Sequence, residues 1–235
     1  MSQQNPQREY PNVKARLRLS RMSPALPPRE SYMDIWMKGT RFRVRDESGR
    51  HVAEILGDLS ANRGLGVPAH SIEEIMDIWS QSQDMGAATR GVTELYGDLA
   101  TGEGWVLRGG QAAWPIRADE LAPAAEQILA GGLDKQLEPR GQVTRLGRPS
   151  TKYHGFLEGG DQGIPYKSEV TRVVSQPYLL LSEVRNAQNA NHSYTREVVS
   201  LQEGAAADPD LTPPTKNKGV RPLKFRQFRR TNWKS

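Results

Sequence analysis

The chain has 235 residues, enough for one domain with tails or at most two small domains. Cysteine is absent, which excludes disulfides, thiolate chemistry and cysteine metal sites. The net charge is +5, from 32 basic and 27 acidic residues, and no apolar run approaches the roughly 20 residues that cross a bilayer.

The amino terminus, residues 1–11, is a polar extension without the apolar core of a secretory signal. Taken as it stands, this start predicts a cytoplasmic protein. If a leader was removed before this start, a periplasmic or membrane-peripheral location is expected instead.

The first part of the chain has the patterns of β-strands. Val13 to Met22 alternates apolar with basic residues, which is typical of a half-buried strand. In the run 31–45, apolar residues before Gly39 occupy both odd and even positions, so they would point to both faces of a strand. After Gly39, apolar and basic residues alternate. Because a glycine where the burial pattern changes suggests a bulge, we expect one long strand bent near Gly39. A returning strand is expected at 51–56.

Helix signals occur twice. Ser71 and Glu74 have the spacing of a capping box, which predicts a helix from 71 to about 82, and 119–130 is helical in pattern with a glycine stop. Residues 105–116 predict a hairpin around Gly109–Gly110. Further strands are expected at 143–157, 166–175, 178–186 and 194–202. The fold class is therefore α+β, with a strongly curved antiparallel sheet, an incomplete barrel, covered by helices.

No pattern of catalytic residues is present. The four histidines, His51, His70, His154 and His192, are scattered without metal-ligand spacing. Glu73, Glu74 and Asp161 lack a partner for acid–base work, and no glycine pair is followed by the Gly-Lys-Ser/Thr of a phosphate loop. We therefore expect no enzymatic activity, no cofactor and no metal.

The order of elements resembles the outer-membrane lipoprotein carrier and receptor family (LolA/LolB-like). The likeness covers residues 12–214 and is carried by three short stretches, 35–44 (IWMKGTRFRV), 104–111 (GWVLRGGQ) and 209–214 (PDLTPP). It implies an incomplete barrel whose concave apolar face receives lipid acyl chains without a reaction. The absence of a signal peptide and a lipidation cysteine, and the presence of a basic tail, depart from that family.

The resemblance also implies a set of cavity-wall residues. On the expected bent strand and hairpin these are Met33, Ile35, Trp36, Met37, Phe42, Trp105 and Trp114. Each of them could instead pack an ordinary core, because methionine and tryptophan at such spacing serve either role.

The tail, residues 215–235, holds eight of the basic residues and no acid, so the first 215 residues have 24 basic against 27 acidic. The expected partner-binding residues are Lys224, Phe225, Arg226, Phe228, Arg229, Arg230 and Trp233. An acidic groove on a protein or lipid headgroups fits this tail better than nucleic acid, because the body is net acidic. A solubilising extension is the alternative for the tail.

Two functions follow from these features. One is a carrier that holds an acyl chain or a lipoprotein in the cavity of a curved sheet. The other is an accessory subunit that the basic tail docks to a larger protein complex.

Overall fold

The computed structural model describes residues 9–23, 26–48, 92–108, 112–129, 135–161, 164–187 and 193–213. Its first strands are β1 (Tyr10–Ser23), β2 (Leu26–Gly39), β3 (Arg41–Asp46), β4 (Thr93–Asp98), β5 (Glu103–Arg108) and β6 (Ala112–Arg117). The helix α3 (Ala118–Leu129) follows. The later elements are β7 (Glu138–Arg145), β8 (Arg148–Asp161), β9 (Ile164–Ser175), β10 (Tyr178–Asn186), β11 (Ser193–Glu203) and the short 3-10 helix η3 (Asp208–Leu211).

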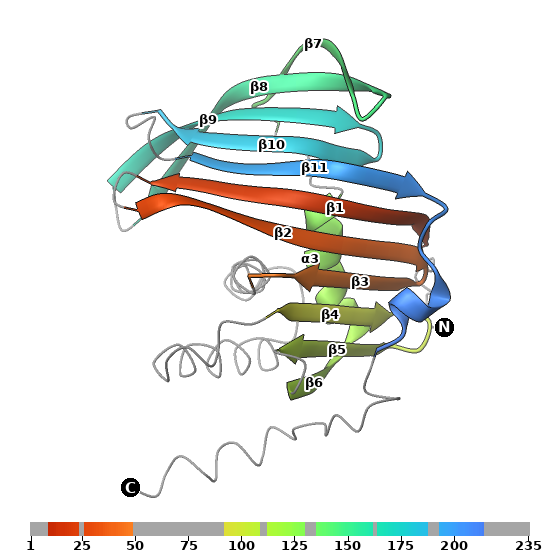
Figure 1. The fold of residues 1–235 in the computed structure, drawn as a ribbon. Helices are drawn as coiled ribbons and strands as arrows, with labels where there is room; N and C mark the ends of the chain where they lie inside the picture. The colour runs from red at the N-terminus through yellow and green to blue at the C-terminus, as the bar shows by residue number, and fades with distance from the viewer. Residues whose placement is uncertain are drawn as a thin grey trace, which may run out of the picture. The chain divides into compact units, whose positions relative to one another are not determined.

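The strands form one antiparallel sheet of eleven strands in the order β6-β5-β4-β3-β2-β1-β11-β10-β9-β8-β7. β1 and β11, the first and last strands in the chain, are neighbours in this sheet (Figure 1). Every other pair of neighbours is consecutive in sequence, and the order does not return on itself, so β6 and β7 are its two edges. This confirms the α+β class with a large antiparallel sheet that does not close.

The chain divides into two compact units. Met1–Lys14, Asp34–Ala125 and Glu203–Ser235 belong to the first, and Ala15–Met33 and Glu126–Gln202 to the second. β1, β2 and α3 each contribute residues to both units.

α3 confirms the helix predicted at 119–130. Asp119 and Glu120 occupy its first turn, where carboxylates interact favourably with the helix dipole. Its apolar side chains are small near the start, and Ala118 lies over Gly104 of β5. A Cβ atom added at Gly104 would lie 3.1 Å from the Ala118 nitrogen, so glycine permits this close approach.

The prediction of one bent strand across 31–45 is wrong. Gly39 has a φ of +57° and Thr40 is in a turn, so the chain reverses there and continues as β3 beside β2. Thr40 donates a hydrogen bond to Asp98 Oδ1 at 2.8 Å, and its carbonyl accepts from Leu99 N. The change in burial pattern at Gly39 therefore marks a hairpin and not a bulge.

The strand predicted at 143–157 is likewise two strands. Leu146 and Gly147 have φ values of 50° and 71° and connect β7 to β8 as a two-residue hairpin turn. β9, β10 and β11 confirm the remaining predicted strands, and β5 and β6 pair as the predicted hairpin. β4 was not predicted. The expected strand at 51–56, the helix at 71–82 with its Ser71 cap, and the tail at 215–235 lie outside the described residues.

Candidate functional site

β2 and β3 separate apolar from charged side chains by the alternation of the strand. On one face, Ile35, Met37, Phe42 and Val44 are buried with exposed fractions between 0 and 3%. Met33 has the same parity on β2 and is also buried. The apolar stretch ends at Asp46, whose carboxylate accepts hydrogen bonds from the backbone and hydroxyl of Ser48.

Phe42 is packed tightly on this apolar face. Its ring lies over Gly97 of β4, the residue paired with it in the sheet, and a Cβ atom added to Gly97 would come within 2.3 Å of the ring. Tyr10 meets the same ring edge-on, with ring centroids 5.9 Å apart. The space over Gly97 is thus filled by an aromatic ring, because glycine leaves room for it.

The opposite face carries Trp36. Its side chain packs with Ala206 and Leu211, near the end of the described chain, and not with Ile35 or Met37. Trp105 lies with Tyr96 and Leu107 in a separate cluster. Because Tyr96 pairs with Arg43 across β3 and β4, Trp105 shares the face of the charged residues.

The seven predicted cavity-wall residues therefore do not share one face. Met33, Ile35, Met37 and Phe42 lie on apolar faces of their strands, whereas Trp36 and Trp105 lie on the charged face of β2–β5. The backbone of Trp114 pairs with Val106 in the β5–β6 hairpin. The cavity itself stays a prediction.

Arg43 is the centre of the charged face. Its guanidinium carbon lies 4.5 Å from the ring centroid of Trp36 and 5.1 Å from that of Tyr96. Its Nε and Nη2 donate to Glu94 Oε2 at 3.2 and 2.9 Å, and Nη1 donates to the Asp210 carbonyl at 3.1 Å. Each guanidinium nitrogen is therefore engaged, in a site where Arg43 is only 18% exposed.

Tyr96 completes this cluster. Its hydroxyl donates to Glu94 Oε2 at 2.6 Å. Burial of the phenol, followed by the hydrogen bond and the charge of Glu94, raises the pKa of Tyr96 well above its ordinary value. The hydroxyl therefore remains a proton donor to Glu94 at neutral pH.

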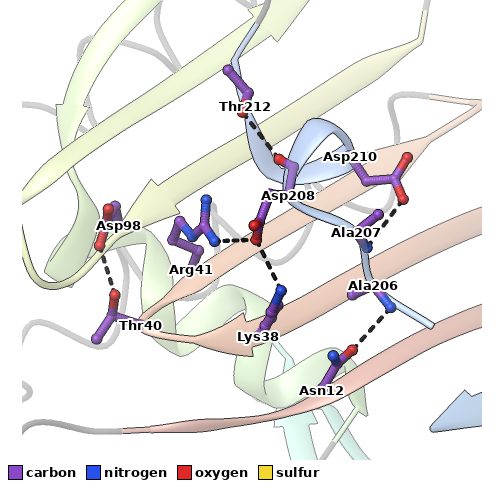
Figure 2. Close-up of polar contacts among 10 residues, drawn as sticks. All are labelled: Asn12, Lys38, Thr40, Arg41, Asp98, Ala206, Ala207, Asp208, Asp210 and Thr212. Carbon is purple, nitrogen blue, oxygen red and sulfur yellow. Dashed lines mark hydrogen bonds and ion pairs between the residues drawn. The ribbon is translucent and has the colours of Figure 1, made fainter. Parts of the chain in front are cut away.

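The segment around η3 is held to β1, β2 and β3 by polar contacts (Figure 2). Asp208 Oδ1 accepts hydrogen bonds from Lys38 Nζ at 3.0 Å and from Arg41 Nη2. These two cations, Lys38 first, lower the pKa of Asp208. Asn12 Oδ1 accepts from the Ala206 backbone at 2.9 Å.

A pocket of about 140 Å³ lies beside this segment. Tyr96, Trp105, Asp98 and Arg41 contribute to its wall, as does Pro213, the last described residue of the chain. The indole Nε1 of Trp105 is buried and has no hydrogen-bond partner within the part of the chain that the structure describes. The pocket combines aromatic rings with charges of both signs, at the point from which the basic tail continues.

Few groups suited to chemistry appear in the described residues. His154 is the one histidine among them, and its Nδ1 lies 3.3 Å from the Thr171 hydroxyl. In the same ranges no cluster of three or more potential ligand side chains could hold a metal ion, and no helix has the length and apolar character to cross a membrane. The predicted partner-binding residues Lys224–Trp233 lie outside these ranges.

Sequence reasoning missed the cluster of Arg43, Glu94 and Tyr96. One signal was available, the alternation of arginines at Arg41, Arg43 and Arg45 with apolar residues, which places three cations on one face of a strand. Their partners depend on the pairing of β3 with β4, which local patterns do not specify.

No protein-family model matches the chain, and no curated protein matches it. Solved structures with a similar fold include the following three. An uncharacterized conserved protein from Thermus thermophilus aligns at 10% identity over 90% of this chain and 88% of its own, with a TM-score of 0.43. The LolA superfamily protein NE2245 from Nitrosomonas europaea aligns at 10% identity over 90% and 93%, with a TM-score of 0.32. LprF from Mycobacterium bovis aligns at 11% identity over 85% and 90%, with a TM-score of 0.36. The function of this chain must therefore be argued from its own contacts.

Proposed function

We propose that the chain is a non-catalytic binding protein that holds an apolar acyl ligand on the apolar face of β2 and β3. The observation that carries the proposal is the separation of faces. Ile35, Met37 and Phe42 offer only apolar atoms, whereas Arg43 and its neighbours keep their charges on the opposite face. An acyl chain needs apolar side chains and no charged partner, and the first face carries such side chains, buried in this structure.

The charged face supports binding rather than catalysis. A general base or nucleophile must direct hydrogen-bonding capacity at a substrate. Arg43 has each guanidinium nitrogen engaged, and Glu94 Oε2 accepts from both Arg43 and Tyr96. This cluster is a clamp that holds Asp210 and η3 against the sheet.

The methionines suit a ligand of variable shape. Met33 and Met37 flank Ile35 at the same parity of β2. Methionine has a flexible, polarizable side chain that re-packs around different apolar partners. Met33 and Met37 are buried in this structure, so an acyl chain that binds here has to displace them.

A photoreactive monoacylglycerol with a diazirine on its acyl chain tests the proposal. Trypsin releases one peptide, Glu30–Lys38, that contains residues of both faces of β2. We expect labelling of Ile35 or Met37 in this peptide, resolved by tandem mass spectrometry. A tenfold excess of unlabelled monoacylglycerol should suppress the label.

Labelling of Trp36 in that peptide would contradict the proposal, because Trp36 lies on the opposite face. The absence of any competed label on β2 or β3 would contradict it as well. The matched control is the same experiment with a diazirine probe that lacks the acyl chain, which should leave the peptide unlabelled.

The second candidate is an accessory subunit docked through the basic tail. The specific observation in its favour is the fastening of Asp208 by Lys38 and Arg41, which fixes the point where the described chain ends. The basic tail follows directly after this point in the sequence. Native mass spectrometry of protein purified from its source separates the two functions, because a bound lipid supports the carrier and a bound protein supports the subunit.

A further inference from the structure

A pocket of about 390 Å³ lies on one face of β7–β10, within the second unit. Its volume falls in the range of roughly 300–1,000 Å³ typical of ligand sites. The other face is in contact with other parts of the chain at Gly155 of β8 and at Arg196 of the neighbouring strand β11. A Cβ atom added at Gly155 would lie 2.6 Å from the Gln136 carbonyl, and Arg196 donates to the Gln127 carbonyl at 3.0 Å. The pocket therefore belongs to the face away from these contacts.

Residues that pair across neighbouring strands form rows in the wall of the pocket. Lys152, Val173 and Leu181 are aligned across β8, β9 and β10. Glu169 lies four residues before Val173 on β9, which places its row about 13 Å away at the usual rise per residue. One end of the pocket thus combines a lysine with apolar side chains, and the other end holds Glu169.

The lysine end has excess positive charge. Arg145 lines the pocket and pairs with Arg148, four residues before Lys152, but its Nη2 donates to Glu197 Oε1, and Glu197 pairs with Leu181 of the lysine row. Glu197 also accepts from Arg18 at 2.6 Å through Oε2, so one carboxylate serves two guanidinium groups. Lys152 adds a further cation, and within the described part of the chain it has no ion-pair or hydrogen-bond partner.

The acids of the pocket do not cancel this charge. Glu183 is engaged by Arg185, whose Nε donates to it at 2.9 Å. The backbone row of Glu169 lies about 13 Å along the strands from that of Lys152, which exceeds the Debye length of about 8 Å at physiological salt. Salt therefore screens most of the influence of Glu169 on an anion bound near Lys152.

The same end has unused donors and apolar surface. The Nε–H of Arg145 is buried without a hydrogen-bond partner in the described ranges, and burying such a donor unpaired is unfavourable. Val143 is 37% exposed beside it, and Val173, which is 5% exposed, and Leu181 also line the pocket. An oxyanion would satisfy the donors, and a short hydrocarbon would cover the apolar atoms.

We propose that this pocket binds an amphiphilic anion, with its carboxylate or phosphate at Lys152 and Arg145 and its hydrocarbon against Val143, Val173 and Leu181. This site uses other strands than the acyl-binding face of β2 and β3, so it does not depend on that proposal. Carboxylate and phosphate monoester share the required chemistry, and the experiment distinguishes them.

Isothermal titration with sodium octanoate, octyl phosphate and octan-1-ol, each below its aggregation limit, tests the site. We expect at least one of the two anions to bind and the neutral alcohol to bind at least tenfold more weakly. Amide chemical shifts should move around Lys152, Val173 and Leu181. Binding of octanoate alone identifies a carboxylate site, and binding of octyl phosphate alone identifies a phosphate site.

Lys152→Gln should weaken binding of the anion at least tenfold, and Lys152→Arg should retain it. Lys152 is exposed, so neither change threatens the fold. Lys135→Gln, at an exposed lysine outside the pocket, is the matched control and should bind as the unaltered protein does. The proposal is overturned if neither anion binds, if octan-1-ol binds as well as the anions, if Lys152→Gln has no effect, or if the shifts fall on β2 and β3 instead.

Discussion

The guanidinium of Arg43 lies 4.5 Å from the ring centroid of Trp36, and this contact joins β3 to the packing of the C-terminal segment. Trp36 packs against Leu211, and Arg43 binds the carbonyl of Asp210, so both residues hold η3. Cation–π contacts of this kind are strongest where water is excluded. η3 is thereby held by one arginine and one tryptophan from adjacent strands.

Replacing Arg43 by lysine keeps the charge but removes the planar fork that reaches Glu94 and Asp210 together. We expect Arg43→Lys to lower the free energy of unfolding by about 2 kcal/mol, as for hydrogen bonds to charged groups. Urea denaturation measures this change. Arg117→Lys is the control, because its ion pair with Asp119 is exposed, and it should leave stability unchanged. Equal stability of the two variants would show that Arg43 is not a clamp.

The pKa of Asp208 tests the fastening of η3 directly. Lys38 and Arg41 lower this pKa, so their stabilising contribution is present above the ordinary pKa of aspartate and is lost as pH falls through the lowered value. In a carboxyl-carbon NMR titration we expect Asp208 to titrate below the ordinary range. Lys38→Gln should raise its pKa, whereas Lys14→Gln, which removes a lysine over Trp36, should not change it. An Asp208 pKa in the ordinary range would contradict the contact.

Local sequence patterns predicted the elements whose apolar residues recur at a regular spacing and whose ends carry turn or stop residues. The predicted limits of 178–186 agree with β10, and the helical pattern before a glycine stop located α3. The reversal at Gly39 could not be distinguished from a bulge, because glycine accepts either backbone conformation. The contact that holds Thr40 in the turn, with Asp98, joins residues 58 positions apart.

The cluster around Arg43 depends even more on the pairing of strands that are far apart in the sequence. The alternation around Phe42 and Arg43 predicted that their side chains point to opposite faces. It could not show that Glu94, 51 positions later, meets Arg43. The separation of Trp36 from Ile35 follows from strand parity alone, but the resemblance to a family grouped them as one cavity wall. Parity was the better guide to which side chains share a face.

Gly97→Ala tests the packing of the apolar face. The added methyl group would lie 2.3 Å from the Phe42 ring, and Tyr10 restricts the movement of that ring. We expect a loss of about 2 kcal/mol in the free energy of unfolding, as for overpacked cores. In a double-mutant cycle, Phe42→Leu should recover part of this loss when combined with Gly97→Ala. Strictly additive losses would mean that the two residues do not compete for the same space.

Leu146→Asn should stabilise the β7–β8 hairpin. Leu146 has a φ of 50° and is 42% exposed, so its left-handed backbone conformation costs free energy that burial of its side chain does not offset. Asparagine before Gly147 suits a turn with two positive φ values. We expect the free energy of unfolding to rise by about 0.5–1 kcal/mol, measured by thermal melts. Leu146→Ala, which retains the backbone strain, should give no such gain; if Leu146→Asn is destabilising, the leucine side chain contributes more than its backbone conformation costs.

Removal of residues 216–235 should leave the sheet folded. The last contacts of the described chain are made by Asp208, Asp210, Leu211 and Thr212, all before the deletion. The deleted segment has eight cations and no acid, so its removal also lowers the net charge from +5 to −3. We expect the midpoint of thermal unfolding to stay within experimental error. Unfolding of the truncated protein would show that the tail belongs to the domain.

The same truncation should abolish association with an anionic partner. Native mass spectrometry of tagged full-length and truncated protein, each purified from the source cells, measures this loss. The cations of the tail should speed encounter and lose their effect with added salt, because screening shortens their range. Alanine at Phe225, Phe228 and Trp233 together should weaken binding even at high salt, because aromatic anchors supply affinity that salt does not remove. Full association of the truncated protein would identify the tail as a solubilising extension and leave the acyl-binding function as the one to pursue.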